Sequence, residues 1–478
     1  MGDSKSRFNA FIFFGSKLLT KALSFLLIPV WTLAFSPAQY GVVGNLMAWA
    51  GFLSPLIMIG LPGAVVRMRP DCETEEQWER FVQSVALVLI ATSLVFLGAS
   101  SVIGERAWLF LTSGEIQYWP LVPITLVAVA LGALARLALA VYQAEQKAWM
   151  VMLFEQALSI GVIIWALVLV FVFDLGVVGY MTGGLVGAAS VSAIFGIKLL
   201  KQKASFVFEK SLIAGALAYG LPLVPQAVAA WTLNLSDRVM LERFSGLSQA
   251  GLYNLAANFA VVISMAAISI NQAVLPRYLR KAKEEFNCSR ERREGLKNIA
   301  LPGFVALAFL ISMAVAFGPW ALGLMVNERY LPALPLVVPV LGGSFFFGIG
   351  QFMLLPLFFQ KKTRLIASIT IIGAIVNLIL NYLFIPEHGA VAAAYTTLAS
   401  YVLTFVMAYF AARRSDWMGI KGVEVLAICG GALVAIGICW WKDGAAIEEW
   451  VIRLLVCGLV AGLFLLWFVK LVRPGTAS

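Results

Sequence analysis

Long apolar runs, separated by short polar connections, cover most of the chain. Connections such as "SPAQ" and "FDLG" are so short that successive runs must be antiparallel. An isolated apolar strand would leave its backbone groups unpaired in lipid, so we expect helices. The pattern predicts an all-α polytopic membrane protein with 14 transmembrane helices. Each has the roughly 20 mostly apolar residues that a crossing needs, and the runs cover residues 8–35, 40–66, 81–104, 116–142, 148–173, 175–198, 212–236, 247–275, 299–325, 332–359, 364–385, 389–411, 421–441 and 449–470.

Composition and charge agree with this pattern. The chain of 478 residues is 61% hydrophobic and 13% charged, whereas a soluble domain is about 25% charged. The two terminal segments and the even-numbered connections, counted together with the cations at the span ends that border them, hold 26 Lys and Arg residues, and the odd-numbered connections hold five. Because cytoplasmic loops carry such an excess, the N- and C-termini are both predicted to be cytoplasmic. The same bias explains the net charge of +10, so no nucleic-acid partner is expected.

The residues that support catalysis or metal binding are scarce. His388 is the only histidine, and the five cysteines are scattered without a CxxC pair. The chain has no GxxxxGK[ST] sequence for binding phosphates and no visible cluster of nucleophile, base and orienting residue. A glycan polymerase or ligase is also disfavoured, because every predicted outer loop is short. We therefore expect no enzyme activity, no metal and no cofactor.

Two stretches indicate an internal repeat. "FSPAQYGVVGNLMA" begins at residue 35 and "FSGLSQAGLYNLAA" at residue 244, and each opens an even-numbered span. The spacing predicts two pseudo-symmetric six-helix bundles, residues 1–205 and 206–412, followed by two extra helices in residues 413–478. Parallel repeats of this kind are a transporter architecture, with the substrate site between the halves near the midplane.

Two lysines lie deep in the first span. Lys17 and Lys21, in "GSKLLTKALSF", lie roughly 13 and 20 Å from its inner end, and residues four apart share a helical face. Adjacent cations are very unfavourable in lipid, so this face is expected to line a hydrated cavity. Pairing with acids on other helices is the alternative, although few acids lie at that depth. A cavity with two cations suits an anionic group such as a pyrophosphate.

Other charged residues within or beside the spans have two interpretations each. Arg136 and Glu155 lie at similar depth across a short connection. They either form a neutralising ion pair or belong to a substrate or ion-coupling path. Asp237 and Arg238 are adjacent, so they need not neutralise each other. Arg238 is then a candidate for the cavity, and Asp237 for a structural pair or for coupling. Glu145, in a connection, is expected to be solvated.

Prolines interrupt the first and seventh spans at comparable places. Pro29 lies in "LLIPVW", and Pro222 and Pro225 lie in "YGLPLVPQ". Proline removes a backbone donor and kinks a helix, so these residues are candidates for a moving gate. The alternative is ordinary membrane-helix proline.

Several amide side chains lie within spans. Asn377 and Asn381 are four residues apart and should share a face. Intramembrane amides more often join helices than bind ligands, but sugar hydroxyls need such partners. Gln272 and Gln351 are our candidates for contacts with a glycan.

The most basic segment, "RYLRKAKEEFNCSRERREGLK", covers residues 277–297. Its apolar residues Tyr278, Leu279, Ala282 and Phe286 could form a stripe that lies on the inner leaflet, which makes anionic lipids a predicted partner. A solvated connector is the alternative.

The segments "LNLSDRVML", "GLSQAGLYNLAANFA" and "INQAVLPRYLRKA" occur in this order around the seventh and eighth spans. Together with the fourteen-span layout, they resemble the polysaccharide flippases of the MOP (multidrug, oligosaccharidyl-lipid, polysaccharide) superfamily, which export O-antigen and exopolysaccharide repeat units. The resemblance covers essentially the whole chain. Its motifs are less specific to the substrate than to the superfamily.

The resemblance implies two six-helix bundles in a V shape around a central cavity, in the bacterial inner membrane. It implies alternating access that moves an undecaprenyl-pyrophosphate-linked oligosaccharide to the outer leaflet, with the polysaccharide polymerase and chain-length machinery as further partners. In related flippases, basic residues in spans 1, 2 and 8 line the cavity. Lys17 and Lys21 match in span 1, Arg67 lies nearer the cytoplasm, and span 8 has no cation in its apolar part.

Three other functions remain open at this point. A drug or metabolite antiporter of the same superfamily would need intramembrane carboxylates in its cavity, where this chain has lysines. A peptidoglycan lipid-precursor flippase shares the same charge logic. A scaffold for glycan assembly would not explain Lys21.

Overall fold

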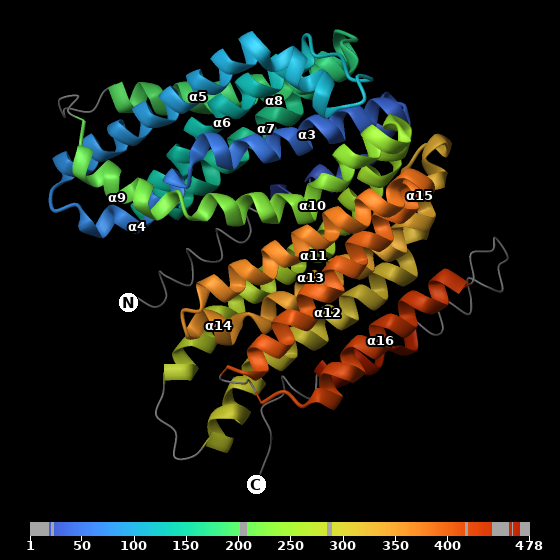
Figure 1. Cartoon of the computed structure of the whole chain (residues 1–478). Coiled ribbons are helices and arrows are strands. Elements are labelled where there is room, and N and C mark those ends of the chain that lie inside the picture. The colour runs from blue at the N-terminus through green and yellow to red at the C-terminus, as the bar shows by residue number, and fades with distance from the viewer. Residues whose placement is uncertain are drawn as a thin grey trace. The chain divides into compact units, whose positions relative to one another are not determined.

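The computed structural model describes residues 19–20, 23–200, 208–283, 289–415, 419–441, 458–460 and 462–468. All regular secondary structure in these ranges is helical, which confirms the predicted fold class (Figure 1). The first ten helices are α2 (Ile28–Ala34), α3 (Pro37–Met58), α4 (Leu61–Met68), α5 (Glu75–Leu111), α6 (Leu121–Ala144), α7 (Ala148–Leu167), α8 (Gly176–Leu200), α9 (Lys210–Gly220), α10 (Leu223–Ser245) and α11 (Leu247–Lys283). They are followed by α12 (Ser289–Met325), α13 (Leu334–Met353), α14 (Leu355–Phe359), α15 (Thr363–Arg413) and α16 (Gly422–Trp441). Three short elements interrupt the series: η1 (Arg69–Asp71) follows α4, η2 (Val168–Val172) follows α7 and η3 (Glu328–Ala333) follows α12.

Ten helical segments in the described part of the chain are long and apolar enough to cross a membrane. Shorter apolar helices accompany them, among them Leu23–Ala34 and Gly422–Val434. The protein is therefore a polytopic membrane protein, as predicted. The total of fourteen crossings stays a prediction.

Helix α15 contains two of the predicted spans. It has 51 residues, and its backbone departs from helical geometry at Gly389 (φ 56°, ψ −135°). Thr396 Oγ1 donates a hydrogen bond to Asn381 Oδ1, although a straight helix would hold residues this far apart at roughly 22 Å. The element is a helical hairpin that turns between the predicted spans 364–385 and 389–411.

Local sequence signals explain where two of the long helices begin. Ser36 and Gln39 form a capping box at the start of α3, in which each side chain accepts a hydrogen bond from the other residue's backbone N–H. Thr74 Oγ1 accepts from the backbone N–H of Gln77 at the start of α5. These hydroxyl caps satisfy backbone donors that the first helical turn leaves unpaired.

The chain forms two compact units, Met1–Gly251 (unit 1) and Leu252–Ser478 (unit 2). Unit 1 includes α9 and α10 because α10 packs along α3 and α9 packs against α4 and α5. The repeat-based boundaries at residues 205 and 412 stay predictions.

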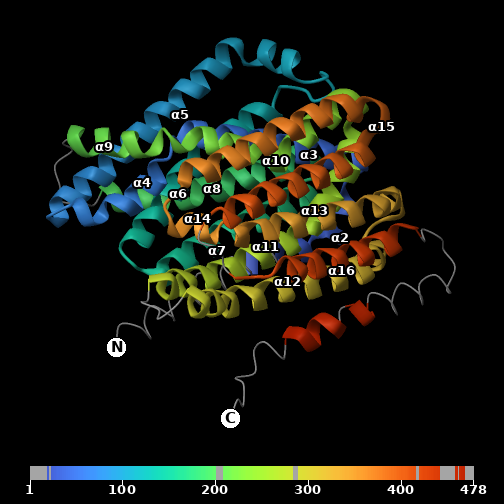
Figure 2. The ribbon, with the colours of Figure 1, turned by 60° about the horizontal axis from the view of Figure 1, so that its bottom comes forward.

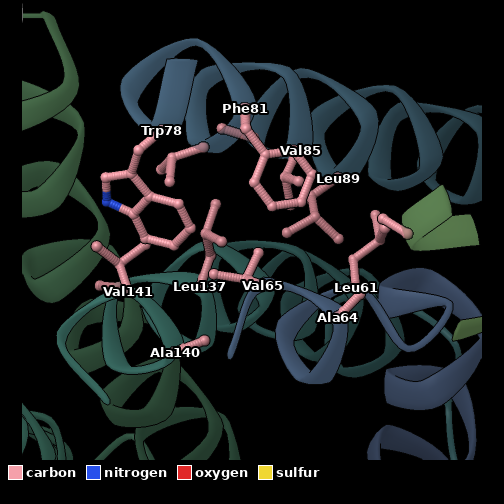
Figure 3. Close-up of a cluster of buried hydrophobic side chains, with 14 of the residues drawn as sticks. Leu61, Ala64, Val65, Trp78, Phe81, Val85, Leu89, Leu137, Ala140 and Val141 are labelled. Carbon is pink, nitrogen blue, oxygen red and sulfur yellow. The ribbon is translucent and has the colours of Figure 1, made fainter. Parts of the chain in front are cut away.

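A core of buried apolar side chains holds unit 1 together where α4, α5, α6 and α9 meet. Figure 3 shows Trp78, Phe81 and Val85 of α5 directed toward Leu137 of α6, with Leu61 of α4 beside them. The α9 contribution is small: Ile213 and Ala216 are the buried residues there. Close van der Waals packing of this kind is what stabilises helix association in lipid, where burying apolar surface brings no gain.

Unit 2 is built around α13, which is buried at most of its positions and packs against α12 and α15. Figure 2 shows α16 alongside α12, and the two helices are in contact. The predicted membrane-surface stripe in residues 277–297 is wrong: α11 continues to Lys283, and Tyr278 and Ala282 are buried within the protein. The side chains of Phe286 and its neighbours lie outside the described residues.

Candidate functional site

Lys17 and Lys21 lie outside the described residues, so their role stays a prediction. The described residue between them is Thr20, which contacts α7. Gln156 Nε2 donates to Thr20 Oγ1 at 3.1 Å, and the Ser159 hydroxyl lies 3.4 Å from the same oxygen. The first span therefore meets a polar face of α7 at Thr20.

Arg136 and Glu155 lie near that polar face. Arg136 is on α6 and exposed, Glu155 is on α7 and half-buried, and the two side chains attract each other electrostatically. The ion-pair interpretation requires this attraction, but the attraction does not exclude a role of the two residues in ion coupling. Both interpretations stay predictions.

Asp237 and Arg238 form part of a buried polar cluster on α10. Their exposed fractions are 2% and 5%, and Arg238 Nη1 lies 3.6 Å from Asp237 Oδ1. Nη1 also donates to the carbonyl oxygen of Asn234 at 2.9 Å, while Asn45 Nδ2 of α3 donates to the Arg238 carbonyl at 3.4 Å. The long arginine side chain curls back along its helix, so adjacent residues do pair here. In this conformation the guanidinium meets acceptors of the protein itself.

One turn further along α10 lies Glu242, a buried charged residue that was not predicted as part of a site. It is 1% exposed, and its Oε1 accepts hydrogen bonds from the backbone N–H (2.9 Å) and the hydroxyl of Ser113. Beside it, Arg243 Nη1 donates to the carbonyl of Phe110 at 2.8 Å. These contacts attach the end of α10 to the last turn of α5 and to the connection between α5 and α6. The available signal was the spacing of four residues between Arg238 and Glu242, which places them on one helical face.

The amide residues of unit 2 lie in two kinds of environment. Asn377 and Asn381 share a face, as predicted: Asn381 Nδ2 donates to Asn377 Oδ1 at 3.1 Å, and both residues are buried. Gln272 is exposed on α11, and Gln351 is half-buried near the end of α13. The two asparagines therefore form hydrogen bonds inside the α15 hairpin, while the two glutamines stay candidates for glycan contact.

The candidate gating prolines lie at or beside interruptions of the helices. Pro29 is in the first turn of α2, which follows a turn at Leu27. Pro222 caps α10 directly after the turn that ends α9, and Pro225 lies in the first turn of α10. A comparable break separates α3 from α4 at Ile59 and was not predicted.

Glu145, at the end of α6, is not simply solvated as predicted. It accepts a hydrogen bond from Trp78 Nε1 at 3.3 Å and forms an ion pair with Lys147 at 2.7 Å. Burial raises the pKa of this carboxyl group, but hydrogen bonds from Lys147 and Trp78 and the positive charges of Lys198 and Lys147 outweigh burial and lower the pKa overall. The carboxylate therefore joins the start of α5 to the connection between α6 and α7.

An apolar cavity of about 200 Å³ lies between α3, α5 and α6. Its walls include Trp49, Trp108 and Val122. Such a lining suits hydrocarbon and not a charged pyrophosphate or a sugar. Among the described residues, no three His, Cys, Asp or Glu side chains gather as a metal site would require.

Comparisons with known proteins bear on this arrangement. Residues 6–281 match the sequence pattern of the protein family described as polysaccharide biosynthesis protein. An uncharacterised membrane protein of Methanocaldococcus jannaschii is 24% identical over 265 residues, which are 55% of this chain and 51% of that protein. The succinoglycan biosynthesis transport protein ExoT of Rhizobium meliloti is 25% identical over 316 residues, which are 64% of this chain and 58% of that protein. The chain thus matches little more than half the length of each relative.

Solved structures share the fold. The lipid II flippase MurJ in an inward closed conformation superposes with a TM-score of 0.73 at 16% identity, over 97% of this chain and 100% of that chain. An inward-facing multidrug resistance MATE family transporter of the MOP superfamily has a TM-score of 0.64 at 14% identity, over 82% and 94% of the two chains. At these identities the likeness establishes the fold alone.

Proposed function

Because the chain belongs to the polysaccharide biosynthesis protein family and has the fold of MOP superfamily transporters, we propose that it is a flippase for lipid-linked oligosaccharides. Its substrate is an undecaprenyl-pyrophosphate-linked repeat unit, which it moves from the cytoplasmic to the periplasmic leaflet of a bacterial inner membrane. The observation that carries the proposal is the family match over residues 6–281, on a chain whose described part has ten helical segments long and apolar enough to cross a membrane. The succinoglycan relative is named as a transport protein, and this supports the exopolysaccharide class.

The proposed arrangement has fourteen crossings and cytoplasmic termini. The hairpin in α15 supports the count, since one long element contains two spans. The substrate site lies between the two six-helix halves that the sequence repeat defines, and it opens to each side in turn. The polysaccharide polymerase and the chain-length machinery are the proposed partners.

Lys17 and Lys21 hold the pyrophosphate in this mechanism, with Arg238 as a further candidate. A pyrophosphate diester carries about two negative charges, so the loaded site is nearly neutral and the empty site is cationic. Moving one charge across the membrane field changes the free energy by about 2.3 kcal/mol per 100 mV. An inside-negative potential therefore returns the empty protein to the inward-facing state. If an ion gradient drives turnover instead, Asp237 or Glu155 becomes the coupling residue.

A peptidoglycan lipid-precursor flippase is the second candidate function. The fold likeness to the lipid II flippase favours it, and the two lysines would serve its pyrophosphate equally well. A drug antiporter, which the fold likeness to the multidrug transporter raises, is less favoured because organic cations need carboxylates where this chain has lysines.

The test is leaflet exchange of a fluorescent undecaprenyl-pyrophosphate oligosaccharide in proteoliposomes. We expect exchange to need the protein, to accelerate with an inside-negative potential and to collapse in the Lys17→Ala/Lys21→Ala variant. Lys17→Arg/Lys21→Arg should retain most of it, and Lys421→Ala, at an exposed lysine before α16, should retain all of it.

Each contrary result changes a different part of the proposal. Persisting exchange in the double alanine variant would make the lysines structural. Exchange of a lipid-linked peptidoglycan precursor alone would select the second candidate. Well-folded protein without any exchange would reject the flippase.

A further inference from the structure

The tripeptide Gly-Leu-Pro occurs at residues 60–62 and again at residues 220–222, and each copy lies at a break between two helices. At the first copy, α3 gives way to α4. At the second, α9 gives way to α10. Proline removes a backbone donor and hinders the preceding helical turn, so both copies mark points where a long helical segment bends more easily than elsewhere.

The two breaks touch each other through their glycines. A Cβ atom added to Gly60 would lie 2.5 Å from Gly220 Cα, and one added to Gly220 would lie 2.4 Å from the carbonyl oxygen of Ile59. Such distances are far below van der Waals contact. Glycine is therefore required on both sides, because any side chain would separate the two backbones.

The first break also holds a backbone conformation that is unusual for its sequence. Gly60 has φ 74°, which glycine adopts readily. Ile59 has φ 41°, in the left-handed region that β-branched residues rarely enter. Such conformations persist only where the surroundings enforce them, and they concentrate at switch regions.

On one side of this contact, α3 and α10 form a packed pair. Trp231 Nε1 of α10 donates to the carbonyl of Ala48 at 2.6 Å, and its ring lies 4.8 Å from that of Phe52. Gly51 lies against the same indole: a Cβ atom added to Gly51 would lie 3.2 Å from Cδ1 of Trp231. The α3–α10 pair is thus joined within about three helical turns of the break.

On the other side, α4 and α9 form a second pair, which belongs to the apolar core of unit 1. Ala64 of α4 and Ala216 of α9 are both fully buried in that core, and an added Cβ atom on Gly215 would lie 3.1 Å from Met68 Cε. Figure 1 shows α4 and α9 next to each other. Along the chain, α4 follows α3, and α9 leads into α10.

We propose that the two Gly-Leu-Pro breaks form one shared pivot, so that α4 and α9 move as a single body relative to α3 and α10. Bending at only one break would change the distance between backbones that already touch at Gly60 and Gly220. Bending both together preserves the contact and the packing within each pair. The pivot rests on the geometry of unit 1, and only its use in transport rests on the proposed function.

The first test needs no substrate. Spin labels are placed at the exposed positions Arg67 of α4 and Ser211 of α9, and electron paramagnetic resonance measures their separation in lipid nanodiscs. We expect one narrow distance in the parent protein and in Gly63→Ala, where an added Cβ atom meets nothing within 4 Å. Gly220→Ala should broaden the distribution or add a second distance. Several distances in the parent protein, or a Gly220→Ala distribution identical to that of Gly63→Ala, would overturn the proposal.

The second test keeps both pivot glycines. Met68→Cys and Gly215→Cys, in a chain whose native cysteines are replaced, allow α4 and α9 to be joined by a short thiol cross-linker. We expect lipid exchange to change by no more than about twofold on cross-linking, because the joined segments move together. A loss of lipid exchange of about tenfold is equivalent to about 1.4 kcal/mol in the barrier. If cross-linking causes such a loss and chemical reduction of the cross-link reverses it, α4 and α9 separate during the cycle. If the uncross-linked protein exchanges no lipid, the proposed function fails, while the spin-label distances still decide the pivot.

Discussion

The two units contain buried polar clusters of opposite character. In unit 1, the cluster on α10 is charged: Asp237, Arg238 and Glu242 are each at most 5% exposed. In unit 2, the cluster inside α15 is neutral: Asn377, Asn381 and Thr396 have similar burial. The charged cluster connects different elements, since Glu242 binds Ser113 across the chain, whereas the neutral cluster joins the two arms of one hairpin.

The difference shows how the cost of burial depends on charge. A buried ion requires a partner because its desolvation costs several kcal/mol, and removing that partner leaves the cost uncompensated. A buried amide or hydroxyl loses much less, and its hydrogen bonds within membranes contribute about 0.6 kcal/mol on average. The charged cluster should therefore be sensitive to single substitutions and the neutral cluster tolerant.

The largest effect is expected for Arg238→Ala. The substitution removes the guanidinium that lies beside the buried Asp237 carboxylate. The free energy of unfolding should therefore fall by about 3 kcal/mol or more. Unfolding in detergent by a denaturant titration measures the change, with Arg329→Ala at an exposed position as the control. A loss below about 1 kcal/mol would mean that water reaches these charges. Normal stability combined with lost lipid exchange would move Arg238 to the substrate site.

An intermediate effect is expected for Asn381→Ala. The variant loses the hydrogen bonds to Asn377 and Thr396, and the free energy of unfolding should fall by about 1 kcal/mol. The same titration applies, and Asn298→Ala, at an exposed asparagine on α12, should leave stability unchanged. Destabilisation equal to that of Arg238→Ala would contradict the ranking of neutral below charged clusters.

The smallest effect concerns Glu145, a charged group with partial access to water. Its pKa is lowered in the folded state, so it contributes stability that is present above its unfolded pKa of about 4.3. That contribution is lost as the pH falls through the lowered folded value. Glu145→Gln should therefore reduce stability at neutral pH by about 1 kcal/mol or less, and the difference from the parent protein should shrink below about pH 4. Thermal unfolding between neutral and acidic pH checks this, and a difference independent of pH would refute it.

Much of the fold could be predicted because lipid imposes few solutions. Long apolar runs had to be helices, and the boundary between residues 385 and 389 coincided with the turn of the α15 hairpin. The shared face of Asn377 and Asn381 followed from helical periodicity alone. The break at Pro222 followed from the missing backbone donor of proline.

The site was harder to predict because its contacts join distant parts of the sequence. Nothing near Glu145 in the sequence indicates Trp78 as its partner, and nothing near Tyr278 indicates that neighbouring helices bury it. The pairing of Gly60 with Gly220 had a visible signal in the repeated Gly-Leu-Pro sequence, but only the fold brings the two copies together. The roles of Lys17 and Lys21 rest on the sequence alone.

The sequence by itself determined the solvent of this protein, its helical class and the positions of its helix breaks, because hydropathy, periodicity and proline act over short stretches of chain. Tertiary structure decided that the buried Glu242 meets Ser113 and that Gly60 touches Gly220. Those outcomes depend on packing between segments more than a hundred residues apart, where a difference of one ångström separates a contact from a clash.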